Sequence, residues 1–234
     1  DVCSSDLNPS IVAHPDQTGA PEDGVRFLLS LRGIGEGHLS SITFRTGHWC
    51  PRDGFVVDPA SPTAATPRIT AQEEDADGAC TRIDCTGSEE VSETVLFPVT
   101  AAQRQGIEDL RMCPFEEEDG TIRHLGTYTA FSGAAARSEL LEADSFRAFV
   151  MREMSGDAAA AKGIALFPRR IGGRYAALSR QDNENVWLVY SDSLTHWQGG
   201  EEGAPQDQAG AGAARVLDDG AQATLDEACR DAHD

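Results

Sequence analysis

The most marked shortage in this sequence is of lysine, and of positive charge in general. The 234 residues include 39 acidic side chains against 19 basic ones, which gives a formal charge of −20 at pH 7. Lys162 is the single lysine beside 18 arginines. An acidic excess of this size repels phosphate backbones, so a general nucleic-acid-binding protein is excluded. Because a guanidinium does not replace an ammonium group at every site, the one lysine is a candidate functional residue.

Long apolar runs are also missing. No stretch reaches the ~20 consecutive apolar residues that span a bilayer, and no charged start is followed by the apolar segment of a secretory signal. The sequence therefore predicts no membrane segment, and we expect a cytoplasmic location. The hydrophobic content of 40% is still enough for a packed core.

Paired cysteines and the common catalytic motifs are absent too. Six cysteines are scattered without a Cys-x-x-Cys pair, and Cys80 and Cys85 have no histidine close by. This predicts free thiols in a reducing compartment and no metal site. The sequence holds no Gly-rich nucleotide motif, no His-Glu-x-x-His and no Gly-x-Ser-x-Gly. It therefore predicts no cofactor and excludes the usual nucleotide, zinc-protease and esterase sites.

Short apolar segments, bounded by glycine, proline, asparagine or aspartate, fill most of the chain. Alternating, β-branched and aromatic residues in several of them predict strands, and no segment keeps a helical period over three turns. The predicted fold class is all-β, and a sandwich, a barrel or a propeller would fit. The predicted strands are residues 26–31, 40–45, 94–99, 110–115, 122–131, 146–152, 174–179 and 185–190.

Four other segments predict irregular structure. Residues 138–144 fit one helical turn or an irregular connection, and residues 58–92, rich in Pro, Thr, Asp and Gly, predict an exposed, poorly ordered insertion. We expect residues 1–7 to be a non-native leader. Residues 199–234 contain only three large apolar side chains and no aromatic ring, so we expect a disordered or frame-shifted tail. The domain would then span residues 8–198.

Two places carry charged residues suited to chemistry. Glu108 and Asp109 are adjacent, so on a strand one would face a cavity and the other the wall; a turn with a surface carboxylate pair is the alternative. The window 158–181 contains no acid, although the chain average predicts about four, and it holds Lys162 and four arginines. An anion could bind there. The alternative is a basic hairpin face that balances acidic neighbours.

Residues 179–187 are dense in side chains that hydrogen-bond sugar hydroxyls, and they end at Trp187. A turn built on Asp-Asn would also explain this composition.

Several short motifs follow one another in a fixed order along residues 8–197. They are Asn-Pro-Ser at 8–10, Ser-Ile-Thr-Phe-Arg at 41–45, Leu-Phe-Pro-Val at 96–99, Gly-Ile-Glu-Asp-Leu-Arg at 106–111, Gly-Thr-Tyr-Thr-Ala-Phe at 126–131, Lys-Gly-Ile-Ala-Leu-Phe-Pro at 162–168, Arg-Tyr at 174–175 and Tyr-Ser-Asp-Ser-Leu-Thr-His-Trp at 190–197. As an ordered set they resemble glycoside hydrolase family 130, the β-mannoside phosphorylases and related mannosidases. The resemblance implies a five-bladed β-propeller with its active site in the central funnel. The matching part is shorter than such a propeller, so we expect a truncated fragment, an incomplete propeller of about three blades.

The resemblance also implies roles for individual residues. Asp109 matches the catalytic acid of the family's Glu-Asp-Pro-Arg motif, although Leu110 stands where that motif has proline; the acid's proton is thought to pass through a sugar hydroxyl to the glycosidic oxygen. Lys162 and Arg180 match phosphate-binding positions, and Ser179 replaces a phosphate-binding histidine of the phosphorylases. The candidate substrate-binding residues are Asn8, Arg45, Arg111, Tyr128, Asp182 and Glu184.

Two reactions remain open for such a site. Phosphate is already an anionic nucleophile, so phosphorolysis needs one acid and a cationic cradle. Inverting hydrolysis needs a second carboxylate, roughly 6.5–9.5 Å from the acid, to activate water. Lys162 and Arg180 favour phosphate, whereas Ser179, together with Asp182 and Glu184, leaves hydrolysis open.

We therefore expect an enzyme that cleaves the β-mannosidic bonds of an oligosaccharide or glycoconjugate with inversion, by phosphorolysis to mannose 1-phosphate. Inorganic phosphate would be its co-substrate. The alternatives are an inverting β-mannoside hydrolase, a sugar-binding propeller without catalysis, and an inactive fragment. The sequence leaves a homo-oligomer open.

Overall fold

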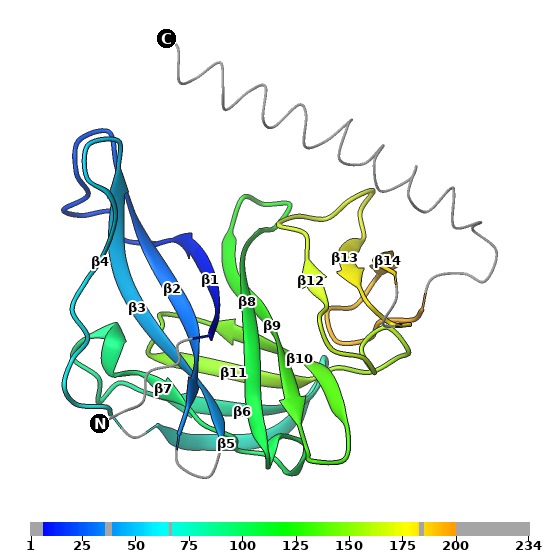
Figure 1. Ribbon diagram of the computed structural model, residues 1–234. Helices are drawn as coiled ribbons and strands as arrows, with labels where there is room; N and C mark the ends of the chain where they lie inside the picture. Colours follow the sequence, from blue (N-terminus) through cyan, green and yellow to red (C-terminus); the bar gives the residue numbers. More distant parts are fainter. Residues whose placement is uncertain (1–6, 36–38, 66, 183–184, 200–234) are drawn as a thin grey trace.

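The computed structural model describes residues 7–35, 39–65, 67–182 and 185–199 (Figure 1). The all-β prediction is confirmed, and no helical segment in this part of the chain is long and apolar enough to cross a membrane. Most of the predicted leader and tail, residues 1–6 and 200–234, lies outside the described residues. The elements are β1 (Leu7–Ala13), β2 (Val25–Ile34), β3 (Ser40–Cys50), β4 (Gly54–Val57), β5 (Arg68–Asp75), β6 (Gly78–Asp84), η2 (Val91–Glu93), β7 (Val95–Leu96), η3 (Ala101–Gln103), β8 (Gly106–Glu116), β9 (Ile122–Phe131), β10 (Ala136–Ala143), β11 (Ala148–Glu153), β12 (Ala165–Leu166), β13 (Tyr175–Ser179) and β14 (Trp187–Ser191).

The strands form three groups, seen from left to right in Figure 1. The first group is β1, β2 and β3, with the short β4 and β7 also paired to β3. The middle group is the antiparallel series β8, β9, β10 and β11, extended at its outer edge by β6 and β5. The third is β12, β13 and β14. A parallel register pair, Ser40 with Gly106, joins the first two groups. The number of propeller blades stays a prediction.

The prediction of a poorly ordered insertion at residues 58–92 is wrong. The segment contains the hairpin of β5 and β6, and β6 pairs antiparallel with β11. Ile83 and Cys85 are buried in the hydrophobic core and Cys80 is buried on the opposite face of β6, whereas β5 is exposed along most of its length. The polar composition that suggested a loop belongs to an edge strand, which faces water on most of its surface.

The prediction of a helical turn or irregular connection at residues 138–144 is also wrong. This segment lies in β10, between β9 and β11 in the middle group. Leu140 and Leu141 are adjacent and both are buried, because the two faces of this sheet are covered. A central strand of this kind lacks the apolar–polar alternation from which a strand is usually predicted.

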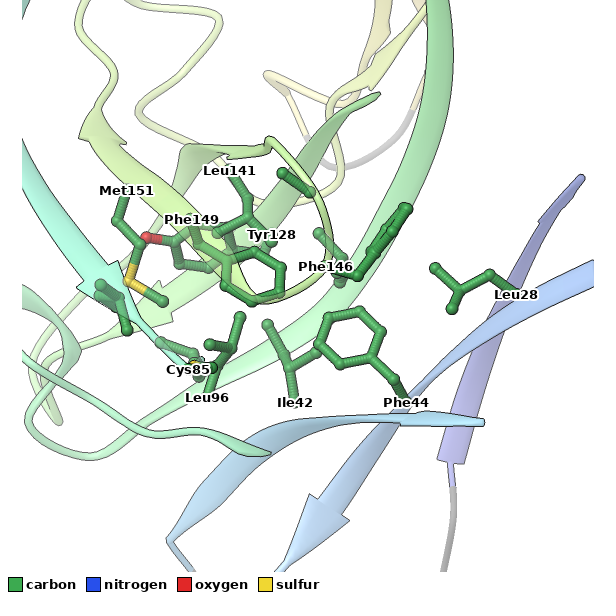
Figure 2. Close-up of a cluster of buried hydrophobic side chains, with 14 of the residues drawn as sticks. Leu28, Ile42, Phe44, Cys85, Leu96, Tyr128, Leu141, Phe146, Phe149 and Met151 are labelled. Carbon is green, nitrogen blue, oxygen red and sulfur yellow. The ribbon is translucent and has the colours of Figure 1, made fainter. Parts of the chain in front are cut away.

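Each face of the middle group packs against a neighbouring group. One core contains Leu28, Phe44, Tyr128 and Phe149 and lies between the first and middle groups (Figure 2). The rings of Phe44 and Phe149 stack there with centroids 5.7 Å apart. The second core, centred on Phe115 and the fully buried Trp197, lies between the middle and third groups. Strand β8 contributes to both cores, so it is held rigidly from two sides.

The cysteines within the described residues are structural. Cys50, Cys80, Cys85 and Cys113 are free and buried. Burial raises the pKa of Cys85 and of Cys113 to about 11. Since a thiolate is the reactive form, these two side chains act as small apolar residues and not as nucleophiles.

An ion pair fixes the end of β5 to β11. Arg152 donates to both carboxylate oxygens of Asp75, at 2.7 and 2.8 Å, and this contact lowers the pKa of Asp75 to about 2. The carboxyl of an unfolded chain titrates near pH ~3.9. The stabilisation is therefore present above about pH 4 and is lost as the pH falls toward 2.

We accordingly expect Asp75→Asn to lower the free energy of unfolding clearly at pH 6 and by a smaller amount at pH 2.5. Urea denaturation of the wild type and the variant at both pH values measures this. Asp77→Asn, which removes a charge from the same hairpin, is the matched control and should leave the pH dependence unchanged. An equal loss for Asp75→Asn at both pH values would show that the ion pair does not stabilise the fold.

Candidate active site

Two irregularities in neighbouring strands bring Asn8 and Asp109 together. The register of β1 on β2 shifts between Leu7 and Ser10, and that of β8 on β9 shifts between Glu108 and Arg111. Within these shifts Asn8 has a φ of 54° and Asp109 a φ of 55°, a left-handed conformation that Asn and Asp tolerate better than most residues. Asn8 Nδ2 donates to Asp109 Oδ1 at 2.6 Å. The bulges thus aim two polar side chains at each other.

A guanidinium joins both carboxylates of the acidic pair. Arg32 from β2 donates to Glu108 Oε1 at 2.6 Å, and its Nη1 lies 3.8 Å from Asp109 Oδ1. Arg32 Nε also donates to Ser40 Oγ at 3.0 Å. The prediction that Glu108 and Asp109 point to opposite faces is therefore wrong, because the bulge interrupts the strand alternation at Asp109. The side chain of Asp109 is 28% exposed and that of Glu108 is 17% exposed, so Asp109 is the more open of the two.

Further hydrogen bonds hold β1 against β8. The guanidinium of Arg111 donates to the carbonyl oxygens of Asn8 and Pro9, at 3.2 and 3.0 Å. Ser10 Oγ accepts from the backbone N–H of Met112 at 3.0 Å. Arg111 therefore lies beside the Asp109 cluster, which we define as Asn8, Arg32, Glu108 and Asp109, and it fixes the backbone that carries Asn8.

Two predicted substrate-binding residues lie elsewhere. Arg45 is on the face of β3 opposite to Ser40, Ile42 and Phe44, and it donates to the carbonyl oxygen of Phe44 at 2.7 Å. Because Arg32 contacts Ser40 on the other face, the structure does not bring Arg45 to the Asp109 cluster. Tyr128 is buried in the core, where its hydroxyl donates to Glu139 Oε2 at 2.7 Å.

The basic window 158–181 divides into paired and unpaired cations. The guanidinium of Arg170 lies 3.8 Å above the ring centre of Tyr175, and that of Arg174 is 3.4 Å from Asp192. These two fit the alternative of a basic face that balances neighbouring groups. Lys162 and Arg180 are exposed and have no ion-pair partner among the described residues. Arg180 lies close to the backbone next to Lys162: a Cβ atom placed on Gly163 would be 3.6 Å from Arg180 Cδ.

The segment that carries Lys162 touches the strand next to β8. Thr127 on β9 is the register partner of Arg111, and its hydroxyl donates to the carbonyl oxygen of Ile164. This bond joins the segment just before β12 to β9, the strand that pairs with β8. No contact between Lys162 and Asp109 occurs in the described part of the chain.

Of the remaining predicted site residues, Ser179 and Asp182 make no contact with the Asp109 cluster in the described part of the chain. The hydroxyl of Ser179 is buried and donates to the carbonyl oxygen of Ala158 at 3.2 Å. Asp182 accepts from the backbone and side-chain nitrogens of Asn185, at 2.9 and 2.8 Å, as a turn residue does. Glu184 lies outside the described residues.

Arg32 is the residue of this cluster that the sequence analysis missed. It stands in an otherwise mostly apolar strand, between Leu31 and Gly33, and its side chain is only 21% exposed. A charge in such a run must find a partner, since an unpaired buried charge is costly. An arginine in a mostly apolar strand could therefore have indicated an ion pair with an acidic residue, although it could not show which one.

Comparison with solved structures gives similarities at low sequence identity. One is the β-1,2-mannobiose phosphorylase from Listeria innocua in complex with β-1,2-mannobiose. The sequence identity is 15%, the TM-score is 0.45, and the match covers 82% of this chain and 57% of that chain. Another belongs to a report that the GH130 family of mannoside phosphorylases contains glycoside hydrolases that target β-1,2 mannosidic linkages in Candida mannan, at 14% identity, 82% and 47% coverage and a TM-score of 0.44. A third is a glycosyl hydrolase from Bacteroides ovatus, at 13% identity, 84% and 49% coverage and a TM-score of 0.45.

The chain is similar to part of the GH130 structures. It spans about half of their length. No family model and no curated protein matches the sequence.

Proposed function

We propose that the Asp109 cluster is the active site of a carbohydrate-active enzyme that cleaves β-mannosides with inversion, by phosphorolysis. The observation that carries the proposal is the carboxyl of Asp109, which is fixed on one side and open on the other. Asn8 and Arg32 both contact Oδ1, and Oδ2 has no hydrogen-bond partner among the described residues. A general acid needs this combination of fixed orientation and access to the substrate.

In the proposed reaction, Asp109 gives its proton from Oδ2 to a sugar hydroxyl, which passes a proton to the glycosidic oxygen. The bond from the anomeric carbon to that oxygen breaks as a phosphate oxygen attacks the carbon from the opposite face. The products are mannose 1-phosphate and the leaving sugar with its new hydroxyl. Lys162 and Arg180 would bind phosphate, which agrees with their exposure and with the lack of an ion-pair partner among the residues that the structure describes.

The position of Glu108 supports phosphorolysis over hydrolysis. A base for inverting hydrolysis lies on the opposite face of the sugar from the acid, roughly 6.5–9.5 Å away. Glu108 instead lies on the same guanidinium as Asp109, because Arg32 contacts both carboxylates and donates to Glu108 at 2.6 Å. Glu108 is therefore poorly placed to activate water. Ser179 favours hydrolysis as the second candidate, because its hydroxyl is already used inside the protein and offers phosphate no contact.

The products of one incubation test this function. The chain is mixed with β-1,2-mannobiose, with and without inorganic phosphate, and mannose 1-phosphate and free mannose are measured. We expect mannose 1-phosphate, and only with phosphate. Free mannose as the main product at saturating phosphate would favour the hydrolase, and no cleavage in either case would contradict an active enzyme.

The phosphate site gives a further prediction. Lys162→Ala should raise the KM for phosphate roughly tenfold or more, because one hydrogen bond to a charged group contributes about 1.5–3 kcal/mol. The KM for the sugar should change far less. Arg52→Ala, which removes an exposed cation from the first group of strands, is the matched control. An unchanged phosphate KM in the lysine variant would remove Lys162 from the site.

A further inference from the structure

A cavity lies at the outer part of the middle group, apart from the Asp109 cluster. Its volume is about 440 Å³, and strands β5, β6, β10 and β11 form its floor while the segment around η3 forms one wall. None of the residues that line it belongs to the Asp109 cluster. The volume falls in the range of small-molecule sites and suits a ligand the size of a monosaccharide.

The strand register shows which side chains share the cavity's face. Thr81 pairs with Met151 on one side and with Gln72 on the other, and Glu139 pairs with Glu153. Side chains two residues apart on a strand lie on the same face, so these five residues and Glu74 belong to one face of the sheet. It is the face that packs Met151 into the first core.

Two hydroxyl groups at this cavity lack partners. Thr81 is only 5% exposed, and its hydroxyl has no hydrogen-bond partner among the described residues. Thr100 Oγ1 on the opposite wall is buried and also unpartnered. Buried hydroxyls are usually satisfied, because an unsatisfied one costs free energy. Thr100 Oγ1 has no surface that a ligand could reach, whereas Thr81 lines the cavity, so the hydroxyl of Thr81 indicates a polar ligand that supplies its missing hydrogen bond.

The charge at this cavity is negative. Glu74, Glu139 and Glu153 lie on its face, and Arg137 is the guanidinium that bonds two of them, with Nη2 at 3.0 Å from Glu139 and 3.1 Å from Glu153. Glu74 has no ion-pair partner in the described ranges. Glu73 and Arg152 also line the cavity, and Arg152 is paired with Asp75. The four carboxylates outnumber the two guanidiniums, so the cavity attracts a cation and repels phosphates and carboxylates.

We propose that this cavity binds a small polyhydroxylated ammonium ion of monosaccharide size. The ammonium group lies at Glu74 and Glu153, and the hydroxyls bond to Thr81 and Gln72. This ligand class differs from the mannoside and phosphate of the proposed function, and the inference does not depend on that function.

Three six-carbon probes test the proposal by isothermal titration calorimetry at pH 7. Glucamine carries an ammonium group on a polyol chain, sorbitol has a hydroxyl in its place, and gluconate has a carboxylate. We expect glucamine to bind at least tenfold more tightly than sorbitol, with gluconate giving no measurable heat. Higher salt should weaken the binding of glucamine, because the contact is between charges. Equal affinities for glucamine and sorbitol, or no binding of glucamine, would overturn the proposal.

Two variants locate the site. Glu74→Gln and the isosteric Thr81→Val should each weaken the binding of glucamine about 3- to 10-fold, the effect of one lost hydrogen bond or charge contact. Glu74 is exposed, so its variant keeps the fold even if that of Thr81 does not. Glu118→Gln, an equal charge change on the β8–β9 turn, and Asp109→Asn should leave the affinity unchanged. A loss in Asp109→Asn without one in Glu74→Gln would place the ligand at the other site and overturn the assignment.

Discussion

Replacing Asp109 by asparagine should reduce the turnover of a β-mannoside roughly 10²- to 10⁴-fold, the usual contribution of a general acid. The amide preserves the shape of the side chain, and its oxygen can still accept from Asn8 as Oδ1 does at 2.6 Å. It cannot supply a proton from the position of Oδ2. Steady-state kinetics of the two proteins on β-1,2-mannobiose measure the effect, and thermal unfolding checks that the fold is unchanged.

Asp144→Asn is the matched control for this experiment. Asp144 is an exposed residue just after the end of β10, and its replacement makes the same chemical change outside the Asp109 cluster. Its turnover should equal that of the wild type. Near-normal turnover in Asp109→Asn would remove Asp109 from the proposed mechanism.

Replacing Glu139 by alanine should lower the free energy of unfolding by about 3–5 kcal/mol, the cost of breaking a buried ion pair by removing one partner. The side chain of Glu139 is 1% exposed. Its Oε2 accepts from Tyr128 Oη and from Gln103 Nε2, both at 2.7 Å, and its Oε1 accepts from Arg137 Nη2 at 3.0 Å. Without the carboxylate, a buried hydroxyl, a buried amide and a half-buried guanidinium lose their common acceptor.

Glu153→Ala gives the comparison. Glu153 contacts the same Arg137, at 3.1 Å, but its side chain is exposed, and an exposed pair contributes about 0–1 kcal/mol. Urea denaturation of both variants should therefore show a large loss for Glu139 and a small one for Glu153. Similar losses in the two would show that the buried network adds little to stability.

The sequence predicted the fold class because most of the strands follow the simple pattern of alternation and turn residues. Strand β9 was predicted with its observed bounds, residues 122–131. The failures have physical causes at both extremes of burial. Strand β5 is so exposed that it has the composition of a loop, and β10 is so buried that consecutive apolar residues hide its period.

The site was predicted less completely than the fold. The motifs drew attention to Asn8, Asp109 and Arg111, and the structure brings these three together. Local sequence cannot show that two bulges turn Asn8 and Asp109 toward each other, because a register shift depends on the partner strand. For the same reason Arg32 was missed, since it reaches the acidic pair from a strand more than 70 residues away in the sequence.

The most direct test of the central claim is a crystal structure of the Asp109→Asn variant with β-1,2-mannobiose. We predict that a mannose ring lies against the Asp109 cluster, with a hydroxyl next to the glycosidic bond within hydrogen-bond distance of the position of Asp109 Oδ2. A disaccharide bound elsewhere on the protein, with the cluster unoccupied at saturating ligand, would contradict the account.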